Sequence, residues 1–202
     1  MRPDIEAVSE TLYLPRYALA LESRADRPIV LDEEAVRLTE NLNETLASSE
    51  KGIHRKLVRG RLPRTLITRL TLRIRHFDQV VRGFLERDPD GIVVSLGCGL
   101  SRRRRRVDDG EMRWFELELP AVIGLRRRYF EDTNRFRSIA SSVLAFEWMD
   151  QLPDEPGERF LFLAEWLFMY LEESDVRRLV VKLREQFDGA DLVAEVANRR
   201  VV

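Results

Sequence analysis

Five short apolar runs restrict this chain to very few folds. They lie at 92–96, 112–117, 160–164 and 192–196, with a weaker run at 135–140. A nearly continuous apolar run of this length is typical of a strand that is buried on both faces of a parallel sheet. Because helical patterns separate the runs, we expect an α/β fold with a doubly wound, mostly parallel sheet.

Apolar side chains at three- and four-residue spacing predict the helices. The longest runs from about Pro63 to Glu86, and its apolar stripe comprises Leu66, Leu70, Ile74, Phe77, Val81 and Phe84. Another begins at Pro120, and a third covers 176–187, with acids before it and basic residues within it, as the helix dipole favours. Residues 1 to about 60 are more irregular, with a helix start predicted at Asp32.

The composition argues against several classes of protein. The 202 residues suffice for one domain with its own core. Charged residues make up 34%, but the net charge of -1 argues against a general nucleic-acid or membrane-surface binder. The single cysteine, Cys98, cannot form an internal disulfide, and no apolar run approaches the roughly 20 residues of a membrane helix. With no apolar signal core at the N-terminus, we expect a cytoplasmic protein.

A glycine loop follows the first predicted strand directly, in the sequence Ser-Leu-Gly-Cys-Gly-Leu at 95–100. Glycine lets the backbone turn tightly and approach a ligand closely at the carboxyl end of a strand. Dinucleotide-binding loops need a third glycine, and Arg102 occupies that position, so a nicotinamide or flavin cofactor is disfavoured. A cofactor without a pyrophosphate needs only a shorter loop.

An acid at the end of the second predicted strand, about 20 residues after the loop, suits a ribose. Glu116 and Glu118 both lie there, and either carboxylate can accept hydrogen bonds from two hydroxyls. We prefer Glu118 for this role. A solvated glutamate at a strand end is the alternative.

Three segments together resemble a known family: 94–100 (VSLGCGL), 114–120 (WFELELP) and 164–171 (AEWLFMYL). In this order and spacing they resemble the leucine carboxyl methyltransferase family, and more closely its bacterial O-methyltransferases associated with polyketide biosynthesis. The resemblance extends from about Tyr13 to the C-terminus. It implies a class I, Rossmann-like methyltransferase fold and S-adenosylmethionine as the cofactor. The implied acceptor is a carboxylate or hydroxyl oxygen of a small molecule or polyketide-like compound.

The resemblance also implies a set of cofactor-binding residues. Arg73 would pair with the methionine carboxylate, and Glu165 would lie near the methionine amino group. The others are the methionine-lining Gly97, Cys98 and Gly99, the ribose-binding Glu118, and Val143 and Leu144 beside the adenine. We assign no catalytic residue, because a carboxylate acceptor needs no base and no side chain stands out for a hydroxyl acceptor. Two histidines and one cysteine disfavour a metal site.

The family's organisation implies an N-terminal helical lid over 1–62 and an S-adenosylmethionine-binding α/β domain over 63–202, forming one structural unit. A complete class I sheet has two more strands after the fifth, so we expect a sheet that lacks its last two strands. Its fifth-strand edge offers a surface for a homodimer. Ser101 and Ala145 differ from the residues usual in the family. With the short C-terminus they support an alternative, a catalytically degenerate scaffold or dimerisation protein of the methyltransferase fold.

The five consecutive arginines at 102–106 allow two interpretations. One is a phosphate- or RNA-binding patch, as in a nucleotide-binding regulatory module. The other is a solvated helix face, with one or two arginines paired with Asp108 and Asp109. Because the rest of the chain is not basic, we prefer the solvated face, and we expect no nucleic-acid or membrane partner.

Overall fold

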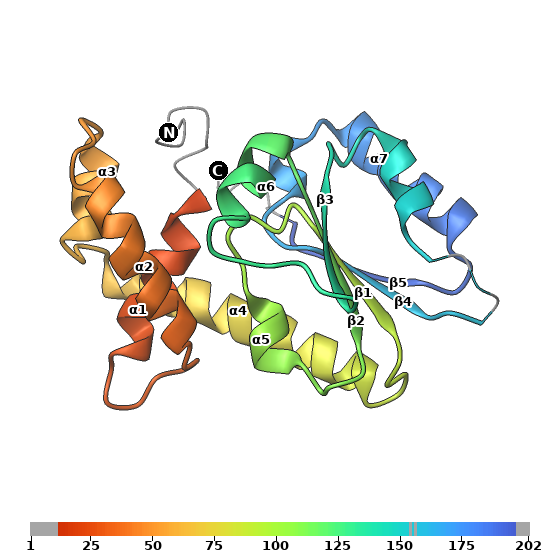
Figure 1. Cartoon of the computed structure of the whole chain (residues 1–202), viewed down its shortest axis with the longest axis horizontal. Coiled ribbons are helices and arrows are strands. Elements are labelled where there is room, and N and C mark those ends of the chain that lie inside the picture. Colours follow the sequence, from red (N-terminus) through yellow and green to blue (C-terminus); the bar gives the residue numbers. More distant parts are fainter. Residues whose placement is uncertain (1–11, 154, 156, 197–202) are drawn as a thin grey trace. The chain divides into compact units, whose positions relative to one another are not determined.

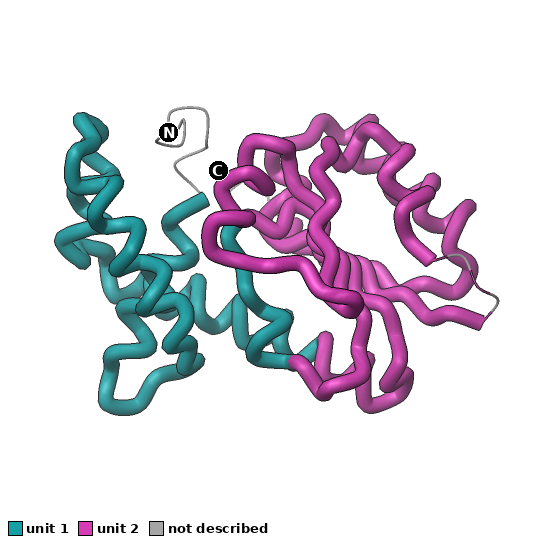
Figure 2. Tube along the Cα trace, in the orientation of Figure 1, with its two compact units in different colours: residues 1–80, 100–107 teal, residues 81–99, 108–202 magenta. Residues whose placement is uncertain are grey.

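The computed structural model describes residues 12–153, 155 and 157–196 (Figure 1). The chain forms two compact units, which Figure 2 colours separately. Unit 1 comprises residues 1–80 and 100–107, and unit 2 comprises residues 81–99 and 108–202. None of the helices in the described ranges has both the length and the apolar character that crossing a membrane requires.

Unit 2 is built on a sheet of five parallel strands (Figure 1). The strands are β1 (Ile92–Leu96), β2 (Arg113–Glu118), β3 (Phe136–Ala140), β4 (Phe160–Ala164) and β5 (Asp191–Ala194). Their order is β3-β2-β1-β4-β5, so the winding direction reverses between β1 and β4. All five predicted strands and the predicted α/β class are confirmed.

Helices and short 3₁₀ segments connect the strands of unit 2. They are α6 (Pro120–Arg126), η3 (Phe146–Gln151), η4 (Phe168–Tyr170) and α7 (Glu173–Gln186). Ile92 and Val94 of β1 belong to one core cluster with Leu179 and Leu183 of α7, so α7 covers that face of the sheet. Every residue of β1 and β4 is buried, which is the physical reason for their continuous apolar runs.

Unit 1 contains α1 (Leu14–Ser23), α2 (Glu33–Leu46), α3 (Gly52–Val58), most of α4 (Arg64–Leu85) and α5 (Arg103–Val107). The predicted helix from Pro63 and the helix start at Asp32 are both confirmed. Asp32 caps α2, since its side chain accepts a hydrogen bond from the backbone N–H of Ala35 at 2.8 Å.

The N-terminal part of unit 1 is more helical than the sequence indicated. Leu19 of α1, Ala35 of α2 and Ile74 of α4 share one buried cluster. Short helices are marginal on their own and form when an apolar face can pack. Packing between these helices therefore stabilises them, and the sequence pattern of each helix alone did not indicate this. The division into a lid over 1–62 and a cofactor domain from 63 stays a prediction.

Candidate cofactor site

The glycine loop leaves β1 beside the reversal in strand order. Ser95 of β1 pairs with Leu163 of β4. Gly97 lies two residues after Ser95, and Glu165 lies two residues after Leu163. The backbone N–H groups of Gly97 and Cys98 both donate to the carbonyl of Leu117, at 2.9 and 3.2 Å. Ligands of open α/β sheets bind outside the carboxyl ends of strands at such a reversal.

Both glycines of the loop have left-handed backbones, with φ of 64° at Gly97 and 53° at Gly99. Residues with a Cβ rarely adopt this conformation. A Cβ added to Gly97 would also lie 3.0 Å from Cδ1 of Leu167. The loop thus needs glycine at position 97 for its backbone angle and for its close packing.

Glu118, the last residue of β2, holds the loop through its carboxylate. Its Oε2 accepts a hydrogen bond from the N–H of Gly99 at 2.9 Å, and its Oε1 accepts one from Leu119 at 2.8 Å. A carboxylate has about four acceptor positions, so these two bonds leave capacity for ribose hydroxyls. Glu116 is buried and forms an ion pair with Arg126. The geometry therefore favours Glu118 over Glu116 for the predicted ribose role.

Arg126 contacts the glycine loop of the candidate site and was not predicted from the sequence. Its guanidinium is 1% exposed and donates to the carbonyl of Gly99 from Nη1 at 2.6 Å and to Glu116 from Nη2. The guanidinium carbon also lies 4.8 Å from the ring centroid of Phe130. Its spacing from Ile123 and Val122, three and four residues earlier in α6, placed it on the buried helix face. That spacing was the available signal.

Cys98 lies buried within the loop. Burial raises the pKa of its thiol well above the usual value, an effect that the nearby Arg126 charge partly opposes. The thiol is therefore protonated at neutral pH, and a protonated thiol is a poor nucleophile. This agrees with leaving Cys98 out of any catalytic role.

The predicted adenine-flanking residues follow β3. Val143 belongs to the core cluster of unit 2, and its carbonyl accepts a hydrogen bond from the indole of Trp148 at 3.1 Å. Leu144 packs partly against the same cluster, and its N–H donates to the Ser142 hydroxyl at 3.2 Å. The segment is thus held in place by its own core contacts and turn.

Glu165 follows β4 and precedes an unusual turn. Trp166 has a φ of 55° and is the one non-glycine residue with a positive φ in the described part of the chain. Such a backbone costs about 1–3 kcal/mol and persists only where the surroundings enforce it. Further along, Phe168 packs against the core cluster whereas Tyr170 is exposed, so these two aromatic side chains differ in environment.

Unit 2 brings most of the predicted cofactor residues to one edge of its sheet. Gly97, Cys98, Gly99, Glu118, Val143, Leu144 and Glu165 all lie at or just beyond the carboxyl ends of parallel strands. Arg73 lies in unit 1, half-buried on α4. Its role toward the methionine carboxylate stays a prediction.

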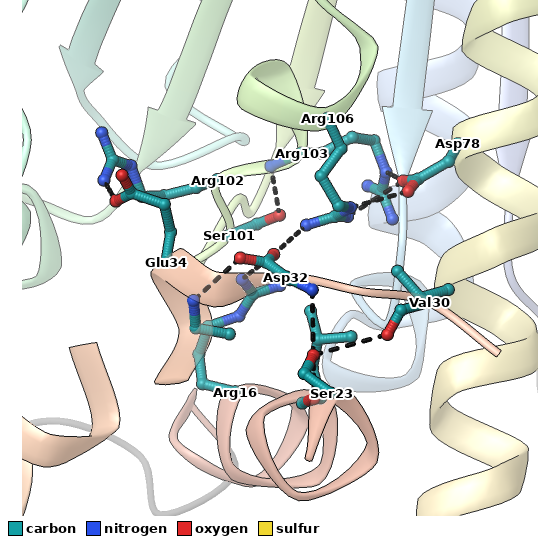
Figure 3. Close-up of polar contacts among 12 residues, drawn as sticks. Arg16, Ser23, Val30, Asp32, Glu34, Asp78, Ser101, Arg102, Arg103 and Arg106 are labelled. Atoms are coloured by element: carbon teal, nitrogen blue, oxygen red, sulfur yellow. Dashed lines mark hydrogen bonds and ion pairs between the residues drawn. The ribbon is translucent and has the colours of Figure 1, made fainter. Parts of the chain in front are cut away.

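The arginine run forms part of a buried ion network in unit 1 (Figure 3). Arg103 and Arg106 each donate from Nε to Asp78 of α4 at 2.7 Å. Arg106 also pairs with Asp32, which lies 3.6 Å from Arg16. Arg102 at the start of the run pairs with Glu34.

The prediction that the arginine run is a solvated helix face is therefore wrong for two of its members, whereas the pairing of one or two arginines with Asp108 and Asp109 stays a prediction. Arg103 and Arg104 are buried. Asp108 forms an ion pair with Arg135 at 2.8 Å. A buried guanidinium must be paired, and the acids that pair with Arg103 and Arg106 are Asp78 of α4 and the α2 cap Asp32. Local sequence could not identify partners that lie 25 and 74 residues away.

The comparison with known proteins agrees with this architecture. The family model for leucine carboxyl methyltransferases matches residues 15–183. The chain belongs to the leucine carboxyl methyltransferase family. The resemblance seen in the sequence is thereby confirmed, and the match includes every predicted cofactor residue of this family member.

A curated relative supports the bacterial branch of the leucine carboxyl methyltransferases. The tetracenomycin polyketide synthesis O-methyltransferase TcmP of Streptomyces glaucescens is 31% identical over 173 residues. The aligned region covers 85% of this chain and 59% of TcmP. The chain thus spans about three fifths of the length of this relative.

Proposed function

We propose that this chain is an S-adenosylmethionine-dependent O-methyltransferase that acts on a carboxylate or hydroxyl of a small-molecule or polyketide-like acceptor. The observation that carries the proposal is the left-handed glycine loop at the strand-order reversal, with Glu118 on the N–H of Gly99. Membership of the leucine carboxyl methyltransferase family and the likeness to TcmP support the reaction class.

The residues at the strand ends fit the parts of this cofactor. Gly97 has no side chain to shield its backbone, so the backbone itself can contact the methionine portion, and a Cβ there would crowd Leu167. Glu118 offers acceptor positions to the ribose hydroxyls, and Glu165 offers a carboxylate to the methionine amino group. Cys98 contributes a neutral, buried thiol within the loop.

S-adenosylmethionine, when bound, supplies a methyl group on a sulfonium, which is already a good leaving group. The chain's contribution is then to hold donor and acceptor in line and to exclude water. A carboxylate acceptor is ionised at neutral pH and needs no general base. A hydroxyl acceptor benefits from one, and we assign that role to no residue.

Isothermal titration calorimetry with S-adenosylmethionine and S-adenosylhomocysteine tests the proposal. We expect micromolar binding that Glu118→Ala weakens by about 1.5–3 kcal/mol, the range for a hydrogen bond to a charged group. Glu111→Ala, an exposed glutamate just before β2, serves as the matched control and leaves the affinity unchanged. Absence of binding up to millimolar cofactor contradicts the proposal.

The degenerate scaffold is the second candidate. It is favoured by Ala145, which leaves the turn after β3 without the acidic side chain usual in the family. In the described structure, this turn closes instead through the N–H of Ala145, which donates to the Ser142 carbonyl at 3.1 Å. A scaffold binds no cofactor and transfers no methyl group. Mass spectrometry of carboxylated and phenolic aromatic acceptors after incubation with S-adenosylmethionine separates the two candidates.

A further inference from the structure

We propose that Arg126 is a positioning residue that fixes the glycine loop in its cofactor-binding shape, and that Glu116 in turn fixes Arg126. The inference deepens the proposed function and rests on it for its effect on cofactor affinity. In this role, Arg126 and Glu116 act through the glycine loop and do not contact the cofactor themselves.

The contacts of Gly99 carry the inference. Its N–H donates to Glu118 at 2.9 Å, and its carbonyl accepts from Nη1 of Arg126 at 2.6 Å. Gly99 itself has a left-handed φ of 53°. Glycine has the largest conformational freedom of any residue, so a loop of this composition keeps one shape only when its peptide groups are held. Here both the donor and the acceptor of Gly99 are held.

The guanidinium is itself fixed from several sides. Glu116 of β2 pairs with its Nη2, and the ring of Phe130 lies 4.8 Å from its central carbon. Both charged side chains of the pair are almost completely buried, at 1% and 5% exposure. A planar guanidinium with this arrangement has little freedom, so the bond that it donates to the loop has a defined direction.

A purely structural role predicts a different behaviour from a positioning role. Replacing both members of a buried ion pair by apolar residues of similar volume is often neutral for stability, whereas removing one member leaves an uncompensated charge. The apolar pair cannot donate a hydrogen bond to the Gly99 carbonyl. A double replacement therefore separates stability from loop geometry.

The experiment uses the full chain with Arg126→Met, Glu116→Leu and the double variant. We expect each single variant to melt well below the parent and the double variant to recover most of that loss. Despite this recovery, the double variant binds S-adenosylmethionine at least about tenfold more weakly. Parent-like stability together with parent-like affinity in the double variant overturns the inference.

The control is the Arg113–Glu158 pair of the same unit, which lies at the amino end of β2, away from the loop. Its double variant, Arg113→Met with Glu158→Leu, is expected to leave the affinity unchanged. Equal losses from both double variants overturn the inference, because they show a general effect of ion-pair removal.

Amide hydrogen exchange provides a readout that needs no cofactor. In the double variant, we expect the peptide covering 95–101 to exchange at least about tenfold faster, while the strands keep their protection. Unchanged exchange in this peptide overturns the inference even if the parent chain binds no S-adenosylmethionine. Failure of the proposed function is thus distinguished from failure of the positioning role.

If the double variant does not fold, Arg126→Lys replaces it. An ammonium keeps the charge beside Glu116 but lacks the fork that reaches two acceptors at once. A folded Arg126→Lys chain with faster exchange at 95–101 and weaker binding supports the inference. Parent-like values for both contradict it.

Discussion

The carboxylate of Glu118 lies 2.9 Å from the backbone nitrogen of Gly99 and joins the end of β2 to the loop that follows β1. The same side chain accepts a second bond from Leu119 at 2.8 Å, so both of its oxygens are used by the backbone. One side chain therefore shapes the candidate site and also offers acceptors to a ligand.

Glu118→Gln tests this double use. An amide has one acceptor oxygen and no charge, so it can keep only one of the two backbone bonds. We expect S-adenosylmethionine affinity to fall by about 1 kcal/mol, the size of one ordinary hydrogen bond. Titration calorimetry should place it between the parent and Glu118→Ala. Binding as weak as that of Glu118→Ala would show that the charge alone matters.

Gly97→Ala should destabilise the chain. Its φ of 64° and the 3.0 Å approach of Leu167 leave no comfortable place for a Cβ. We expect a loss of about 1–3 kcal/mol in the free energy of unfolding, measured by urea denaturation. Gly124→Ala is the matched control, because a Cβ there meets nothing within 4 Å in helix α6. That change should stabilise by about 0.5–1 kcal/mol, and equal effects at both sites would refute the argument.

Asp78→Asn should disrupt the buried network of unit 1. Asp78 serves both Arg103 and Arg106, and its side chain is 3% exposed. Removing one member of a buried ion pair typically costs about 3–5 kcal/mol. The exposed Arg24–Glu40 pair, at 48% and 58% exposure, provides the control through Glu40→Gln. That variant should lose no more than about 1 kcal/mol by urea denaturation, and a similarly small loss in Asp78→Asn contradicts the buried network.

Arg73→Ala tests the role that the family resemblance gives to this arginine. We expect S-adenosylmethionine binding to weaken by about 1.5–3 kcal/mol, while binding of methylthioadenosine, which lacks the methionine carboxylate, stays the same. Arg69→Ala, an exposed arginine one turn earlier in α4, is the control and should bind both compounds like the parent. Equal losses for both compounds in Arg73→Ala would exclude a carboxylate contact.

Cys98 makes stability depend on pH in the alkaline range. Burial holds the pKa of the folded thiol well above its usual value, whereas an unfolded thiol titrates near about 8.5. Above this pH the unfolded state binds fewer protons than the folded state, so the free energy of unfolding falls as pH rises. Below it, the contribution is fully present. Urea denaturation between pH 7 and 10 should show a steeper decline in the parent than in Cys98→Ala, and identical slopes would contradict the burial effect.

Local sequence patterns predicted the five strands and the longest helix. The nearly continuous apolar run at 92–96 is typical of a strand buried on both faces, and the stripe along 63–86 has the period of a helix. Both elements were therefore predicted within a few residues. The glycine loop was also readable, because its two glycines stand between a buried strand and a short helix. These features depend on neighbours in the chain.

Only the folded chain shows which charged residues contact the glycine loop and which form buried ion pairs. In sequence both Glu116 and Glu118 suit a ribose, with Glu118 preferred; in the structure Glu116 pairs with the buried Arg126 and Glu118 binds the glycine loop. Arg103 and Arg106 likewise look solvated in the sequence, but in the structure they form ion pairs with Asp78 and Asp32. The physical reason is that a charge can be buried only beside its counter-charge, and here the counter-charges come from segments that only folding brings together.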